Sequence, residues 1–147
     1  MQPDPTFIAA RFINRSRLAS VQGNLAALET WGKLLQNQLV LMDRLIAAGE
    51  ARRLGRTGAI RIKSLNWDEK TLKATVQGVT DDYLTRITVV PRPGHHCTCP
   101  DWERNGKRVG PCKHVLALGE HWKEERVLPA IARFEDSLVS LLTRLEL

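Results

Sequence analysis

The placement of the three cysteines constrains this chain more than any other feature of its sequence. Cys97 and Cys99 form a C-x-C pair, and after a loop of twelve residues Cys112 begins a C-x-H pair that ends at His114. An odd number of cysteines argues against a framework of disulfides. On extended chain a C-x-C pair directs both sulfurs to one face, because side chains alternate with a period of two. The clustering therefore predicts that the sulfurs and the imidazole converge.

The loop between the two pairs carries strong turn formers, Asn105-Gly106 and Gly110-Pro111, which allow the chain to double back. Zinc(II) takes four sulfur or nitrogen ligands at tetrahedral corners, and a site with four protein ligands is structural. We therefore expect one structural zinc ion on a set of four side chains: Cys97, Cys99, Cys112 and His114. The single imidazole and the presence of only three thiols favour zinc over an iron–sulfur cluster.

Two readings compete with this assignment. In the first, the three thiols are buried side chains near a surface histidine, although the pairing makes chance a poor explanation. His95 or His96, directly before Cys97, would be alternative ligands in place of His114. The pairing favours His114, which is expected inside the first turn of a helix that Cys112 precedes.

Apolar residues at three- and four-residue spacing predict helices before the cysteines. A short helix is expected over residues 6–20, with Gly23-Asn24 as a break and a longer helix over residues 24–48 that Gly49 ends. The apolar stripe of the longer helix comprises Leu25, Leu28, Trp31, Leu35, Leu39, Met42, Leu45 and Ile46.

The period then changes to two, which is typical of strands. Strands are expected over residues 59–63, 72–77 and 83–90, with a turn at 66–70 that presents Trp67 at its tip. Turn-forming residues at 91–94 end this antiparallel meander.

Helical spacing returns after residue 112 and forms a second apolar stripe over 131–145, with Pro129 breaking the pattern or beginning the last helix. The predicted class is α+β, a small meander with a ββα zinc knuckle between flanking helices. The expected divisions are a helical region at 1–50, the meander and finger at 57–119 (finger core 95–118), and a helical region at 120–147.

The motif resembles the SWIM-type zinc finger, and more broadly the small SWIM domain proteins of bacteria. The resemblance rests on Cys-x-Cys-Pro at 97–100 and on the run CKHVLAL at 112–118, with a strand before the first pair. It covers residues 83–119. It implies a ββα zinc module that binds DNA or another protein, as in transposases, remodelling helicases and recombination mediators.

The charge is unevenly distributed. Residues 1–113 have a net charge of +8, whereas residues 114–147 have a net charge of −2. A basic body suggests a polyanionic partner, although a run of charges can equally be a solvated face. The candidate nucleic-acid contacts are Arg92, Arg104, Lys107, Arg108 and Lys113 near the finger, and Arg52, Arg53, Arg56, Arg61 and Lys63 upstream.

These observations predict a zinc-binding module without enzymatic activity, because a saturated metal offers no corner to a substrate. The main hypothesis is a nucleic-acid-binding accessory subunit in recombination, transposition or remodelling, and the resemblance favours DNA over RNA. The alternative is an adaptor whose helices dock a larger enzyme such as a helicase, or a second copy of the chain. No apolar run is long enough to span a membrane, and no signal peptide is evident, so we expect a cytoplasmic protein without a membrane partner.

Overall fold

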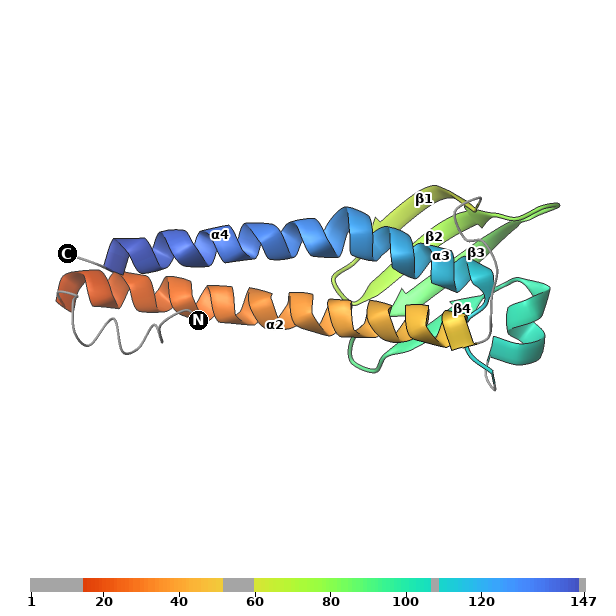
Figure 1. Cartoon of the computed structure of the whole chain (residues 1–147), viewed down its shortest axis with the longest axis horizontal. Helices are drawn as coiled ribbons and strands as arrows, with labels where there is room; N and C mark the ends of the chain where they lie inside the picture. Colours follow the sequence, from red (N-terminus) through yellow and green to blue (C-terminus); the bar gives the residue numbers. More distant parts are fainter. Residues whose placement is uncertain (1–14, 52–59, 107–108, 146–147) are drawn as a thin grey trace. The chain divides into compact units, whose positions relative to one another are not determined.

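The structure is a computed structural model that describes residues 15–51, 60–106 and 109–145 (Figure 1). Its described part combines helices with one four-stranded antiparallel sheet, which confirms the α+β class. The elements in chain order are α2 (Arg15–Ala51), β1 (Arg61–Trp67), β2 (Thr71–Gln77), β3 (Asp82–Thr88), β4 (Gly94–Cys97), η1 (Trp102–Gly106), α3 (Lys113–Trp122), η2 (Lys123–Val127) and α4 (Leu128–Leu145).

The chain divides into two compact units. The sheet unit is Asn37–Val127, and the helical unit consists of the chain up to Gln36 together with Leu128–Leu147. None of the described helices has an apolar stretch long enough to cross a membrane.

The sheet is a meander in which each strand pairs with the next, in the order β1-β2-β3-β4. A β-bulge between Ile62 and Ser64 shifts the register of β1 and leaves Lys63 without an opposite residue on β2. One face carries buried residues of β2 and β3, among them Leu72, Val76 and Ile87. Because side chains alternate, the other face carries the intervening residues, which are mostly polar but include the exposed Leu84.

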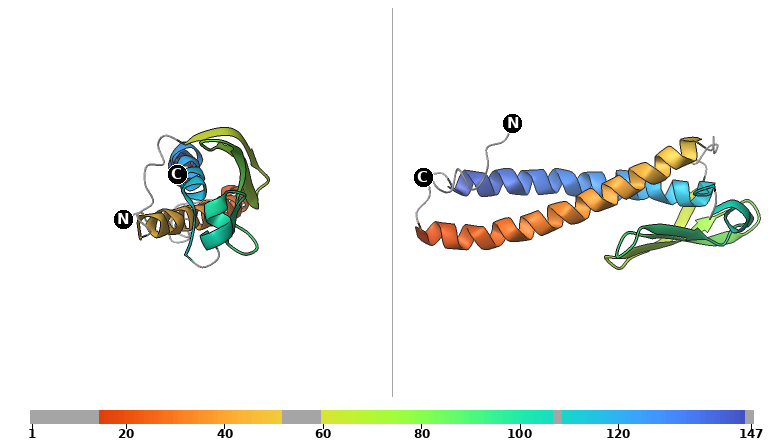
Figure 2. Two further views of the ribbon diagram at one scale, coloured as in Figure 1. Left: turned by 90° about the vertical axis from the view of Figure 1, so that its right-hand side faces the viewer. Right: turned by 90° about the horizontal axis from the view of Figure 1, so that it is seen from below.

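α3 covers the buried face of the sheet, and the last part of α2 packs against α3 (Figures 1 and 2). Gly119 of α3 lies where these layers meet, because a Cβ there would be within 3.9 Å of Met42, Leu45 and Ile87. Trp122 Nε1 also donates a hydrogen bond of 2.8 Å to the side-chain oxygen of Gln38. The finger segment is thus attached to a dense apolar core.

The expected break at Gly23-Asn24 is wrong, because the described residues of α2 form one continuous helix. Nothing lies within 4 Å of a Cβ built at Gly23, so neither packing nor a turn requires glycine there. The expected stop at Gly49 is also wrong, since the helix continues to Ala51. Gly49 is instead a packing position, because its missing Cβ leaves room for the side chain of Leu116. The expected start of the short helix lies outside the described residues.

The sheet differs from the predicted meander in its first strand and at its end. β1 continues to Trp67, so this side chain is not at an exposed tip; its ring lies 5.4 Å from that of Trp122. Asp68 instead makes the tight turn, because its carboxylate accepts the backbone N–H groups of Lys70 and Thr71. These two hydrogen bonds, that from Thr71 above all, lower the pKa of Asp68. After residues 91–93 the chain returns to the sheet as β4, a strand that the turn chemistry did not predict.

In the helical unit the two predicted apolar stripes meet. Leu141 of α4 is almost completely buried and packs with Leu25, Leu28 and Leu142. The rings of Trp31 and Phe134 meet edge to face at 5.7 Å. Pro129 is the second residue of α4, where the absence of its N–H does not break the helix.

Candidate metal centre

The four predicted ligands come from the end of one hairpin and the start of one helix. Cys97 is the last residue of β4, and Cys99 follows it after one residue. After the loop, Gly110 adopts a left-handed φ of 124°, which glycine accepts without strain, and the chain turns back towards β4. Cys112 is the N-cap residue of α3, and His114 lies in the first turn of that helix.

The fold brings the four side chains into one buried cluster. Their ligand atoms all lie within 4.8 Å of one another, and Sγ of Cys112 is 4.0 Å from Nδ1 of His114. Ligands at zinc bond lengths on a tetrahedron are separated by about 3.5–3.8 Å. All four residues are buried, with Cys97 and Cys112 fully inaccessible. The residues present therefore fit one structural zinc ion, both in donor type and in arrangement.

Neighbouring polar groups form hydrogen bonds with two of the sulfurs. The hydroxyl of Thr85, on the strand paired with β4, lies 3.4 Å from Sγ of Cys97. The backbone N–H of Trp102 donates to Sγ of Cys99 at 3.3 Å. Such donors orient metal-bound thiolates and offset part of their charge. Thr85 is buried, so few other hydrogen-bond partners are available to its hydroxyl.

Without a cation the three thiols compete for protons. The hydrogen bond from Cys112 lowers the pKa of Cys97 well below its usual range, while the same hydrogen bond, together with burial, raises the pKa of Cys112. Burial raises the pKa of Cys99 as well. Three adjacent thiolates therefore require a bound cation, which is what a structural zinc ion supplies.

The structure favours His114 over the two alternative histidines. Nδ1 of His95 accepts a hydrogen bond of 3.0 Å from the indole N–H of Trp102, and burial lowers the pKa of His95. His96 stacks on the same indole, with ring centroids 4.3 Å apart. Neither belongs to the buried cluster, whereas the ring of His114 is in it and rests against Tyr83.

The described nucleic-acid candidates lie on several elements, and two of them, Arg61 and Lys113, line the same hollow. Arg92 lies before β4, Arg104 in η1 and Lys113 at the start of α3, and all three are exposed. Arg61 is exposed on β1, and Lys63 forms an ion pair of 2.8 Å with Asp82. The remaining five lie outside the described residues: Arg52, Arg53, Arg56, Lys107 and Arg108.

Other residues at the surface of this unit were not identified from the sequence. Lys73, Arg86 and His96 lie side by side on neighbouring strands, at 73↔86 and 86↔96 in the register. The alternating pattern of β2 and β3 placed Lys73 and Arg86 on polar faces, but only the register brings them together.

Thr85 was also missed, because a lone threonine in a strand does not indicate that its hydroxyl contacts a sulfur.

Comparison with known proteins agrees with the geometry. The family model described as SWIM zinc finger matches residues 88–123, about a quarter of the chain. No curated protein and no solved structure matches the chain. The match spans β4, η1 and α3 and includes all four clustered side chains. Residues 88–123 are therefore a SWIM zinc finger, a binding module whose Cys3His set fits one structural zinc ion.

Proposed function

We propose that this chain is a zinc-stabilised nucleic-acid-binding module that acts as an accessory subunit in DNA recombination, transposition or remodelling. The observation that carries the proposal is the set of exposed basic side chains around the finger. Arg92, Arg104 and Lys113 are exposed, and none forms an ion pair with another described residue. Basic side chains left free in this way are suited to phosphate contacts.

The zinc ion has a supporting part in this function. It fixes the end of β4 against the start of α3, so the basic side chains on the loop and helix are held on a rigid frame. The four protein ligands occupy all tetrahedral positions, and we therefore assign no reaction to the metal.

Fluorescence anisotropy with short duplex and single-stranded DNA tests the proposal. Zinc-loaded full-length protein should bind at 50 mM salt and weaken steeply at 200 mM, because phosphate contacts release counterions. Absence of binding at the lower salt concentration would reject the proposal. An RNA strand of the same sequence tests the expected preference for DNA.

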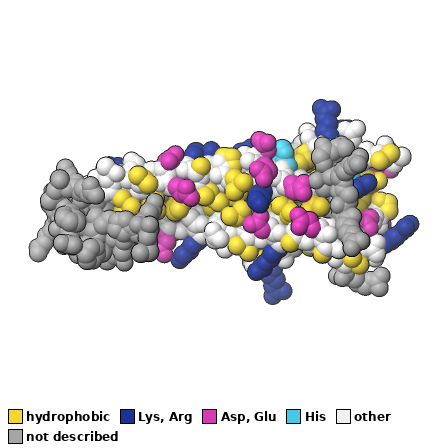
Figure 3. Space-filling view, in the orientation of Figure 1, with side chains coloured by type: hydrophobic (Ala, Val, Ile, Leu, Met, Phe, Trp, Pro, Cys, Tyr) yellow, Lys and Arg dark blue, Asp and Glu magenta, His cyan; other side chains and the backbone are white. Residues whose placement is uncertain are grey.

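A second candidate function, that of a protein adaptor, has support in the helical unit. Leu34, Leu128 and Val139 are 45%, 37% and 50% exposed. Hydrophobic side chains are visible along the helices between charged ones (Figure 3). Such positions suit docking to a larger enzyme or to a second copy. Sedimentation of the purified chain would reveal self-association, and a pull-down comparing wild type with Val139→Glu would test for a separate partner.

A further inference from the structure

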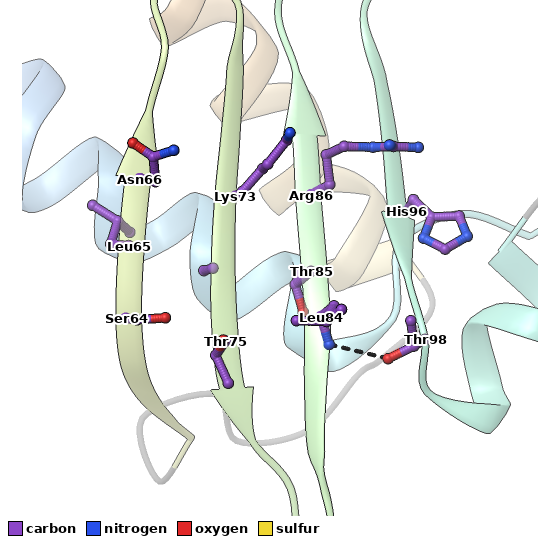
Figure 4. Close-up of a pocket in the computed structure, with 11 residues that line it drawn as sticks. Ser64, Leu65, Asn66, Lys73, Thr75, Leu84, Thr85, Arg86, His96 and Thr98 are labelled. Carbon is purple, nitrogen blue, oxygen red and sulfur yellow. Dashed lines mark hydrogen bonds between the residues drawn. The ribbon is translucent and has the colours of Figure 1, made fainter.

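The open face of the sheet carries a row of side chains that crosses all four strands. The register places Asn66 opposite Lys73, Lys73 opposite Arg86, and Arg86 opposite His96. Figure 4 shows the four side chains on the same face of the sheet, each on its own strand. Neighbouring strands are about 4.8 Å apart, so the row extends over about 14 Å.

This row borders a hollow of about 430 Å³ that lies entirely within the sheet unit. The next row on the same face also lines the hollow and comprises the hydroxyl residues Ser64, Thr75 and Thr98 with the exposed apolar Leu84 between the last two. No acidic residue lines it. Two acidic groups lie on the adjoining turns: Asp82 pairs with Lys63, and Asp68 accepts backbone N–H groups of its turn and also attracts Lys73 electrostatically.

Lys73 and Arg86 are like charges directly opposite each other on antiparallel strands. This arrangement destabilises a sheet, because the two cations repel at close range. Neither forms an ion pair with another described residue, and both are exposed. An anion placed between them would remove the repulsion. The row is therefore suited to an anionic ligand and has no evident benefit for the fold itself.

The shape and chemistry of the hollow narrow the choice of anion. Its volume is that of a site for a small molecule or a single chain segment. Hydroxyls and an amide beside the cations are the groups that contact phosphate and sugar oxygens. No tryptophan, tyrosine or phenylalanine lines it, so base stacking is not provided for.

We infer that the open face of the sheet is the main nucleic-acid contact of this chain and holds the phosphate backbone of a single strand across Lys73 and Arg86. This inference rests on the proposed function and locates it. Binding through phosphates alone is indifferent to base sequence, so recognition of a particular sequence is not expected from this face.

The experiment compares three double variants of zinc-loaded full-length protein that lose the same charge. The sheet pair is Lys73→Gln with Arg86→Gln, and the finger pair is Arg92→Gln with Arg104→Gln. The matched control, Arg44→Gln with Arg133→Gln, changes exposed residues on helices, outside both surfaces. All three variants should keep one equivalent of zinc and none should melt below wild type, because every altered side chain is exposed and the sheet pair loses only a repulsion between two cations.

Affinity for a labelled oligothymidine of about 20 nucleotides is measured from 50 to 200 mM salt. The sheet pair should weaken binding about tenfold or more at 100 mM salt and reduce the salt slope by about 1.4, because each single-strand phosphate contact contributes about 0.7. The other two pairs should have smaller effects on both quantities.

Four results would overturn the inference. In the first, the sheet-pair variant binds oligothymidine as tightly as the control variant does. In the second, the finger-pair variant loses more affinity than the sheet-pair variant. In the third, a duplex of equal length binds wild type more tightly than the single strand. In the fourth, polyglutamate displaces the oligonucleotide better than unlabelled oligothymidine does, which would assign the face to an acidic protein. Failure of wild type to bind any nucleic acid would instead remove the proposed function, and the inference with it.

Discussion

The two units of this chain obtain their order from different sources. The sheet unit has a dense core of fully buried side chains, such as Met42, Leu72 and Leu118, and adds a buried set of metal ligands. In the helical unit, Leu141 is the one large side chain with an exposed fraction below 2% among the residues whose burial is described. Leu35 is also buried, whereas the other stripe residues whose burial is described are half-buried. A metal and a core thus stabilise one unit, whereas a narrow apolar stripe stabilises the other.

Removal of the metal should give the largest difference in stability between the two units. Cys112→Ser is expected to lose zinc and the order of β4 and of the start of α3, because structural zinc contributes roughly 10–16 kcal/mol in finger peptides. The helical signal of the helical unit should persist. Metal analysis and thermal unfolding followed by circular dichroism measure the two effects. His121→Ala, at an exposed position on α3, is the control and should resemble wild type. A Cys112→Ser protein with one equivalent of zinc and an unchanged melting temperature would contradict the four-ligand assignment.

Two matched leucine deletions compare the cores directly. Leu118→Ala in the sheet unit should cost about 3–5 kcal/mol, since dense packing around a fully buried leucine leaves a cavity that cannot collapse. Leu141→Ala in the helical unit should cost about 2–3 kcal/mol, because its half-buried neighbours can close around the gap. Urea unfolding measures both, and a chelator challenge should release zinc faster from Leu118→Ala alone. If the two substitutions lowered the free energy of unfolding equally, the two cores would not differ in packing density.

Two glycine substitutions should change the stability of the protein in opposite directions. Gly110→Ala places a side chain on left-handed backbone beside Cys112 and should cost about 1–2 kcal/mol, with weaker zinc retention. Gly23→Ala, in the interior of α2 with nothing within 4 Å of the new Cβ, should stabilise its helix by about 0.5–1 kcal/mol. Melting temperatures of the two variants test the signs. If Gly110→Ala stabilised the protein, the loop would not require a left-handed conformation at this residue.

The smallest expected effect concerns the hydroxyl beside the metal. Thr85→Val keeps the shape of the side chain but removes the group 3.4 Å from Sγ of Cys97. The free energy of unfolding should fall by about 1 kcal/mol, the typical contribution of one hydrogen bond. Zinc release to a colorimetric chelator should be several-fold faster, whereas Thr30→Val, an exposed threonine of the helical unit, should leave it unchanged. Equal release rates would mean that the hydroxyl does not support the thiolate.

The sequence predicted the ligand cluster and the helical stripes, because short-range residue patterns determine both. The ligand cluster followed from two short pairs and turn-forming residues between them, and the apolar stripes followed from helical spacing. The short strand β4 was missed because its sequence, Gly-His-His-Cys, shows no alternation and owes its conformation to pairing with β3. Continuity of α2 through Gly23 was missed because a glycine signals a break even where the helix tolerates it. The cationic row was missed because a cross-strand neighbour depends on register, which no single strand encodes.

The short strand at the end of the meander has a consequence for the protein without its ion. β4 is only four residues long and covers part of the hydrogen-bonding edge of β3, and its last residue is one of the clustered cysteines. If β4 detaches when the ion leaves, β3 presents unpaired backbone groups to solvent. Exposed edges of this kind pair with one another between molecules. Chelation at high protein concentration is therefore expected to produce insoluble material, and the ion protects the chain from aggregation as well as from unfolding.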